Sequence, residues 1–103
     1  MPSIEKIEEL LEREPNDVFL NFGLAMALRS AGREDESLAR FDRTCEIEPT
    51  YVAAYFQKAV LLEQIGRSDE ARGALESGID QARKIGDQHA EGEMREYLET
   101  LGS

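Results

Sequence analysis

Two consecutive stretches of 34 residues decide the fold: VFLNFGLAMALRSAGREDESLARFDRTCEIEPTY at 18–51 and VAAYFQKAVLLEQIGRSDEARGALESGIDQARKI at 52–85. When one is laid over the other without a gap, eight positions are identical. The identical pairs are Val18/Val52, Phe22/Phe56, Ala25/Ala59, Leu28/Leu62, Gly32/Gly66, Arg33/Arg67, Asp35/Asp69 and Glu36/Glu70. A fixed period of this size is typical of proteins built from stacked repeats.

Each repeat is predicted to form two helices, because the chain has no alternating β-branched run that would favour a strand. The predicted helices cover 17–31, 34–47, 52–65 and 68–84. Gly32 and Gly66 fall between the helices of each pair, and glycine reaches the left-handed conformation that closes a helix without a Cβ clash. We expect Ser68 or Asp69 to cap the helix after the second turn.

Two helical segments flank the repeats, at 3–16 and 87–101. In the first, Ser3 is a suitable N-cap and Pro15 ends the helix. Its apolar face is predicted to consist of Ile4, Ile7, Leu10 and Leu11. The second places Ala90, Met94, Leu98 and Leu101 on one face, with Tyr97 adjacent and charged residues on the other side. This pattern is typical of a helix that closes a repeat array.

Length and charge restrict the class of protein. The chain has 103 residues, enough for one domain, and a net charge of -10 from 22 acidic and 12 basic side chains. This balance argues against binding of nucleic acid or of an anionic membrane, which require clustered Lys and Arg. No apolar run is long enough to span a membrane, and the N-terminus lacks the features of a signal peptide. We therefore expect an acidic, cytoplasmic, single-domain protein.

The repeats resemble the tetratricopeptide repeat (TPR) family, whose 34-residue pattern alternates large and small residues and ends near a proline. At the pattern positions repeat one supplies Asn21, Leu24, Ala25, Leu28, Ser37, Phe41, Thr44 and Pro49. Repeat two supplies Tyr55, Lys58, Ala59, Leu62, Ala71, Leu75, Gly78 and Arg83. Three residues depart from the pattern: Asn21 stands in place of a bulky residue, Lys58 in place of leucine and Arg83 in place of proline. Because Arg83 replaces the proline that would end the helix, the last helix of repeat two is expected to run on to about Ile85.

The resemblance implies an all-α fold of about six helices, in which antiparallel pairs stack as a short right-handed TPR solenoid over a single domain, 1–103. It also implies a non-catalytic scaffold that binds a peptide or helix of a partner protein in a concave groove. The family's groove positions include Ser30 and Ala53 here, and the partner-binding residues that they predict are Phe19, Phe22, Met26, Arg29, Phe56, Val60, Glu63 and Gln64. Independently of the resemblance, the apolar composition of helices 17–31 and 52–65 favours an exposed apolar face suited to partner binding.

Three alternatives remain at this stage. An open groove is favoured, but the same apolar residues are also consistent with core packing, with cover by helix 87–101, or with a weak homo-oligomer that buries the face against a second copy. A carboxylate clamp of the kind that holds chaperone tails is not expected, because its positions hold Phe22, Met26, Ala53 and Gln57.

Catalytic and cofactor sites are not expected. His89-Ala90-Glu91 matches only half of a zinc-deaminase signature, and His89 with Glu93 offers two ligands where a metal site needs more. When the two repeats are aligned, Cys45 occupies the position of Ile79. This apolar position favours a packing role for Cys45 over nucleophilic chemistry. No glycine-rich phosphate loop is present. We therefore predict no enzyme activity, no metal and no cofactor.

Overall fold

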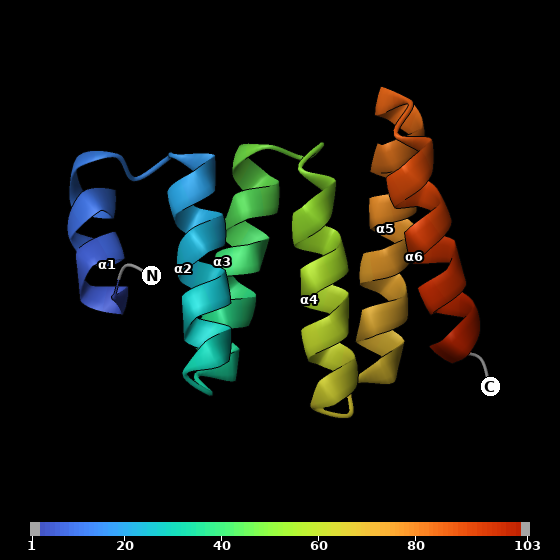
Figure 1. The fold of residues 1–103 in the computed structure, drawn as a ribbon, viewed down its shortest axis with the longest axis horizontal. Coiled ribbons are helices and arrows are strands. Elements are labelled where there is room, and N and C mark those ends of the chain that lie inside the picture. Colours follow the sequence, from blue (N-terminus) through green and yellow to red (C-terminus); the bar gives the residue numbers. More distant parts are fainter. Residues whose placement is uncertain (1–2, 102–103) are drawn as a thin grey trace. The chain divides into compact units, whose positions relative to one another are not determined.

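The computed structural model describes residues 3–101, and within that range its regular structure is helical throughout (Figure 1). The helices are α1 (Ile4–Arg13), α2 (Val18–Ser30), α3 (Glu34–Ile47), α4 (Val52–Gln64), α5 (Ser68–Ile85) and α6 (Gln88–Leu101). The predicted all-α fold class is confirmed, and each of the four repeat helices begins and ends within one residue of its predicted bounds. α1 stops at Arg13, shortly before Pro15.

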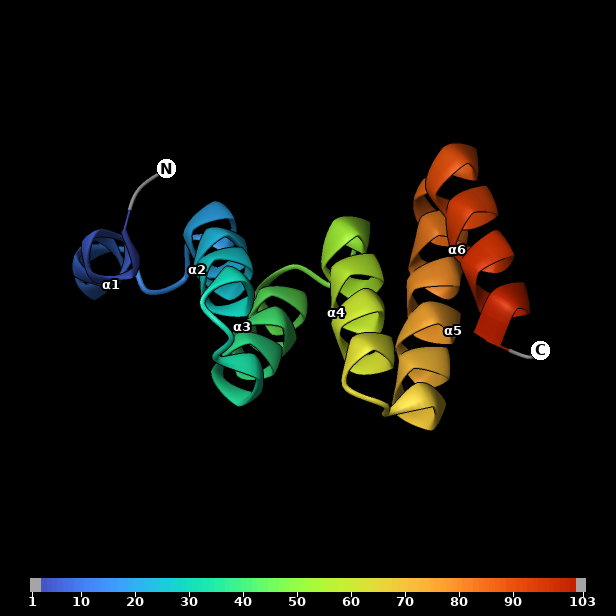
Figure 2. The same cartoon turned by 60° about the horizontal axis from the view of Figure 1, so that its bottom comes forward.

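The helices form two compact units, Met1–Glu48 with α1, α2 and α3, and Pro49–Ser103 with α4, α5 and α6. In the first unit α2 packs against both α1 and α3. In the second unit α5 packs against both α4 and α6, and α6 also reaches α4 (Figure 2). Each unit therefore contains one complete helix pair and one flanking helix.

The turns inside the two repeats have the same geometry. Gly32 and Gly66 adopt φ angles of 76° and 80°, as expected for glycines that close a helix. The N–H of Arg33 donates to the carbonyl of Leu28 at 2.9 Å, and the N–H of Arg67 donates to that of Leu62 at 2.8 Å. These bonds satisfy a terminal carbonyl of each first helix while the chain reverses.

The predicted cap at Ser68 or Asp69 is wrong. α5 begins at Ser68, directly after Arg67, and no side chain caps it. The Ser68 hydroxyl instead donates to Glu63 Oε2 at 2.9 Å. The first turn is held by an ion pair between Arg67 and Glu70, and the same ion pair occurs at the start of α3 between Arg33 and Glu36.

The core of the first unit lies between α1 and α2, and between α2 and α3. Ile7, Leu11, Leu24 and Leu28 form one buried cluster, and Phe41 of α3 is fully buried. Leu10 was predicted on the buried face of α1 but is 38% exposed. Around the helix axis Ile4 and Leu11 lie on one side of Ile7 and Leu10 lies on the other, so Leu10 is at the edge of the buried face.

Small side chains let the helices of the second unit approach closely. Ala54, Ala59, Ala71 and Ala82 are completely buried. Gly78 of α5 is also buried, and a Cβ built there would lie 2.6 Å from the Met94 sulfur and 2.8 Å from the Tyr55 Cβ. Such separations are too short for real contacts, so the glycine is required for α6 to pack where it does.

Candidate functional site

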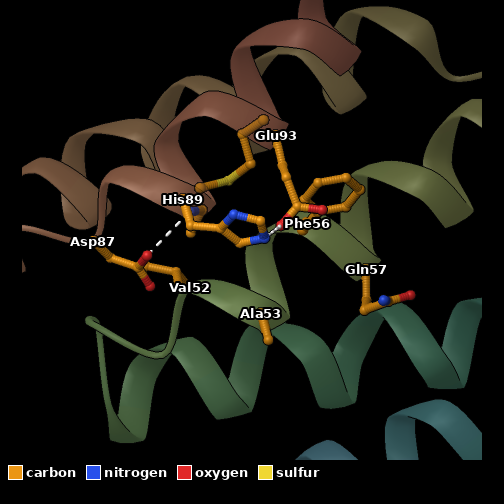
Figure 3. A pocket seen from close by; sticks show the side chains of 9 residues that line it. Val52, Ala53, Phe56, Gln57, Asp87, His89 and Glu93 are labelled. Atoms are coloured by element: carbon orange, nitrogen blue, oxygen red, sulfur yellow. Dashed lines mark hydrogen bonds and ion pairs between the residues drawn. The ribbon is translucent and has the colours of Figure 1, made fainter.

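A hollow of about 340 Å³ opens between α4 and α6 of the second unit (Figure 3). α4 contributes four lining residues and α6 four more, while the residue just before α6 completes the wall. The lining residues are Val52, Ala53, Phe56, Gln57, Asp87, His89, Ala90, Glu93 and Met94. An apolar interior with a few polar groups at its edge is the usual composition of a binding pocket.

The apolar side of the hollow is fixed by packing behind it. Met94 is fully buried and lies against Gly78, which leaves room for its sulfur. The Phe56 ring packs against Tyr97 with a centroid separation of 5.6 Å and a tilt of 50°. Aromatic pairs at this spacing are mutually stabilising, so contact with α6 orients the Phe56 ring.

The polar rim comes from the start of α6. Asp87 Oδ1 accepts a hydrogen bond from the N–H of Ala90 at 3.0 Å, the geometry of an N-cap. His89 Nε2 lies 2.9 Å from Glu93 Oε1, one helical turn away (Figure 3). The His89 and Glu93 side chains are 87% and 53% exposed, so both are accessible to a ligand.

A second, shallower hollow of about 290 Å³ continues along the same two helices. It is lined by Phe56, Glu93, Glu96, Tyr97 and Thr100, and so shares Phe56 and Glu93 with the first. We refer to the residues lining these two hollows as the α4–α6 face. Phe56 lies at its centre, because it lines both hollows.

The predicted groove residues are divided between the two units. Phe19, Phe22, Met26 and Arg29 lie on α2 in the first unit. Phe19 is 70% exposed, whereas Phe22 is half-buried with its ring edge-on to Phe41 at 5.9 Å. The remaining predicted residues, Phe56, Val60, Glu63 and Gln64, lie on α4.

Of the eight predicted partner-binding residues, Phe56 alone lines the α4–α6 face, and Ala53, a further groove position of the repeat, lines it as well. The residues that sequence reasoning missed are mainly those of α6, which was assigned a closing role. Ala90 and Met94 on its apolar face, with Tyr97 beside them, were the available signal. The other half of the signal, Gly78 as the space for Met94, depends on the three-dimensional packing.

Within residues 3–101, no cluster of three or more His, Cys, Asp or Glu side chains is arranged to hold a metal ion. Cys45 is half-buried in α3. None of the helices in the described range is both long and apolar enough to cross a membrane.

Comparison with known proteins places these features in context. A tetratricopeptide repeat family model matches residues 41–73. The crystal structure of a tetratricopeptide repeat domain protein from Salinibacter ruber is 28% identical, with a TM-score of 0.75, over 84% of this chain and 96% of that chain. The solution structure of protein BPP2914 from Bordetella parapertussis is 26% identical, with a TM-score of 0.83, over 99% and 89%.

A third structure, the TPR2B domain of yeast Sti1 in a complex with pHsp70, is 19% identical to this chain. Its TM-score is 0.87, over 96% of this chain and 79% of that chain. At this level of identity the likeness concerns the fold. No curated protein matches the sequence.

Proposed function

This chain is a tetratricopeptide repeat protein, and we propose that it binds a peptide or helix of a partner protein on its α4–α6 face. TPR proteins are in general non-catalytic scaffolds for protein–protein interaction, and the TPR2B structure contains a bound partner. The observation that carries the proposal is the accessible hollow between Phe56 and Met94, with its polar rim of Asp87, His89 and Glu93. It offers an apolar anchor site and polar groups to orient the ligand.

The expected affinity is modest. A fully buried apolar side chain contributes roughly 1.5–3 kcal/mol, and the two hollows accommodate one anchor each. Association and ordering of the peptide cost roughly 4–15 kcal/mol, which additional backbone and polar contacts must help to offset. We therefore expect dissociation constants in the micromolar range or weaker.

Ala53→Arg tests the site without disturbing the core. Ala53 lines the first hollow, and its exposed position on α4 accepts a long side chain that would occupy the opening. Ala39→Arg is the matched control, because Ala39 is also an exposed helical alanine but lines neither hollow. Partners captured from native lysate by the wild type are identified by mass spectrometry, and the direct binding of each is then measured with both variants.

We expect Ala53→Arg to lose the partner and Ala39→Arg to retain it, with equal helicity by circular dichroism. Equal retention by both variants would show that the α4–α6 face is not the binding site. Search for the site would then move to α2.

Self-association is the second candidate function, and the exposure of Phe19 favours it. A phenylalanine that is 70% exposed on α2 is a suitable contact for a second copy of the chain. Sedimentation equilibrium over a range of concentrations tests this. If Phe19 mediates a dimer, Phe19→Ser gives a monomer while Ala53→Arg does not.

A further inference from the structure

We propose that the partner segment on the α4–α6 face is basic, with one or two apolar side chains flanked by Lys or Arg. This inference rests on the proposed function and specifies the chemistry of its ligand. It is carried by the charges around the two hollows rather than by the net charge of the chain.

The Asp, Glu, Lys and Arg side chains that line the α4–α6 face are all acidic. Asp87 and Glu93 line the first hollow, and Glu93 and Glu96 line the second. Neither hollow is lined by a Lys or Arg. The one basic group, His89, contacts Glu93, and an imidazole offsets a carboxylate only when it is protonated.

The cations of the second unit are engaged elsewhere. Arg83 and Arg95 both contact Glu91, at 3.2 Å and 2.9 Å. Arg72 donates to the carbonyl of Leu101 at 3.3 Å. The other three cations, Arg67 in its ion pair with Glu70 and the lysines Lys58 and Lys84, also line neither hollow.

The acidic groups on the face therefore keep most of their charge uncompensated. Glu91, which lines neither hollow, has two arginine partners, whereas Glu96 makes no ion pair within residues 3–101. Asp87 accepts one backbone hydrogen bond, from the N–H of Ala90, and contacts no Lys or Arg in an ion pair within residues 3–101. An approaching acidic segment would be repelled, and a basic one attracted over a distance of about 8 Å at physiological salt.

Lysine and arginine also suit the apolar part of the face. Their methylene stems lie along apolar surface while the charge reaches outward. A Lys next to the anchor can cover Phe56 or Tyr97 with its stem and place its ammonium near Glu93 or Glu96. A segment of this kind satisfies both features of the face with the same residues.

A panel of fluorescein-labelled peptides of about 12 residues tests the inference. Each peptide carries a central Leu or Phe anchor, singly or as a pair, flanked by Lys, Ser or Glu, and its dissociation constant is measured by fluorescence anisotropy. We expect Lys-flanked peptides to bind about tenfold more tightly than Ser-flanked ones, as two or three exposed ion pairs would give. The preference should decrease with added salt.

Glu93→Gln/Glu96→Gln identifies the groups responsible. Its matched control is Glu76→Gln/Glu99→Gln, which removes two charges from exposed positions that line neither hollow. We expect the first variant to lose most of the Lys preference and the control to keep it. If both variants lose it equally, the preference reflects net charge, and the inference is overturned.

The remaining outcomes separate this inference from the proposed function. Anchor-dependent binding that Ala53→Arg abolishes, but that shows no preference for Lys, overturns the basic ligand and leaves the binding site intact. If no peptide binds while the wild type still captures a partner through the α4–α6 face, the basic ligand is likewise overturned. If Ala53→Arg has no effect on any ligand, both proposals fail together.

Discussion

The repeat at 18–51 has three buried polar side chains, whereas the repeat at 52–85 has tyrosine, alanine and glycine at the same positions. Asn21, Ser37 and Thr44 are each fully buried. Their counterparts are Tyr55, Ala71 and Gly78. Both repeats nevertheless form the same helix pair with the same glycine turn. The comparison therefore separates the interactions that both repeats require from those that depend on the neighbouring residues of each repeat.

One side-chain hydrogen bond to the backbone occurs in both repeats, although a different residue makes it in each. Asn21 Nδ2 donates to the carbonyl of Pro15 at 3.1 Å, and the Tyr55 hydroxyl donates to the carbonyl of Pro49 at 2.8 Å. Each carbonyl lies six residues before its donor and just ahead of a first helix. The position thus requires a donor that reaches this carbonyl, and Asn21 serves as well as the larger tyrosine.

The other two positions show demands that differ between the repeats. The Ser37 hydroxyl donates to the Ala25 carbonyl at 2.7 Å, and the Thr44 hydroxyl donates to the Arg40 carbonyl at 2.8 Å, so both buried oxygens are satisfied. Gly78 has no such role and instead leaves space for Met94. At this position of the repeat the first unit has a hydrogen-bonded threonine, whereas the second unit has a glycine that allows two helices to pack closely.

The largest effect on the free energy of unfolding is expected at the position that both repeats fill with a large, buried apolar side chain. Phe41 and Leu75 occupy equivalent positions and are both fully buried. Phe41→Ala should lower the free energy of unfolding by about 3–5 kcal/mol and Leu75→Ala by about 2–5 kcal/mol. Urea denaturation checks both, and a midpoint unchanged by Phe41→Ala would contradict its place in the core.

Gly78→Ala should give the next largest effect and separates the two repeats. Helix propensity alone would favour alanine by about 1 kcal/mol. The clash with Met94 and Tyr55 should outweigh this, giving a net destabilisation of about 1–3 kcal/mol in urea denaturation.

Gly73→Ala is the control for this substitution, because Gly73 is exposed in α5 with no neighbouring atom within 4 Å of an added Cβ. It should stabilise the protein by roughly 0.5–1 kcal/mol. In a Met94→Ala background, the cost of Gly78→Ala should fall. Stabilisation by Gly78→Ala in the wild-type background would refute the close approach of α6.

A further pair of substitutions removes the donors to the Pro15 and Pro49 carbonyls. Asn21→Ala leaves the Pro15 carbonyl and the Arg40 guanidinium without their partner, and we expect a loss of about 1–3 kcal/mol. Tyr55→Phe removes one hydrogen bond, which is exposed to solvent, and should lower the free energy of unfolding by about 0.5–1.5 kcal/mol. Thermal unfolding of the two variants compares them, and a larger cost for Tyr55→Phe would reverse our view of the two solutions.

The smallest effect is the pH dependence of the matched ion pairs. Hydrogen bonds from Arg33 and Arg67 hold the pKa of Glu36 and of Glu70 below that of an ordinary glutamate. A lowered pKa in the folded state means that the stabilisation is present above the unfolded-state pKa and is lost as pH falls through the folded-state pKa.

Glu36→Gln/Glu70→Gln tests this effect. The variant should be slightly less stable than the wild type near neutral pH, and the difference should disappear in acid. Urea midpoints measured between about pH 7 and about pH 3 check it. A difference that grows in acid would have the wrong sign. Both pairs are exposed, so the effect is also expected to weaken with salt.

Local signals in the sequence were sufficient for the helices and their ends. Gly32 and Gly66 have no alternative role that fits a 34-residue period, and Pro15 stops the preceding helix. The cap at Ser68 could not be predicted, because the Arg67–Glu70 pair and the bond from Ser68 to Glu63 depend on competing partners. Leu10 was misplaced because Ile7 and Leu11 already supply the narrow face that α1 buries.

The candidate site was less accessible to sequence reasoning. Phe56 was identified through the repeat pattern, but most of the α4–α6 face comes from α6, which lies outside the 34-residue register. Its orientation depends on a glycine on one helix and a methionine on another, Gly78 and Met94. Two residues that are 16 positions apart show no pattern in the sequence that would pair them.

The methionine behind the first hollow has a consequence for selectivity. Met94 forms part of the wall, and its side chain is unbranched and polarisable, with several rotatable bonds. Here that freedom is suppressed, because Met94 is fully buried and its sulfur is packed against Gly78, so the first hollow should discriminate between anchors as different as leucine and phenylalanine. The protein would then distinguish partners by the shape of the anchor as well as by its flanking charges.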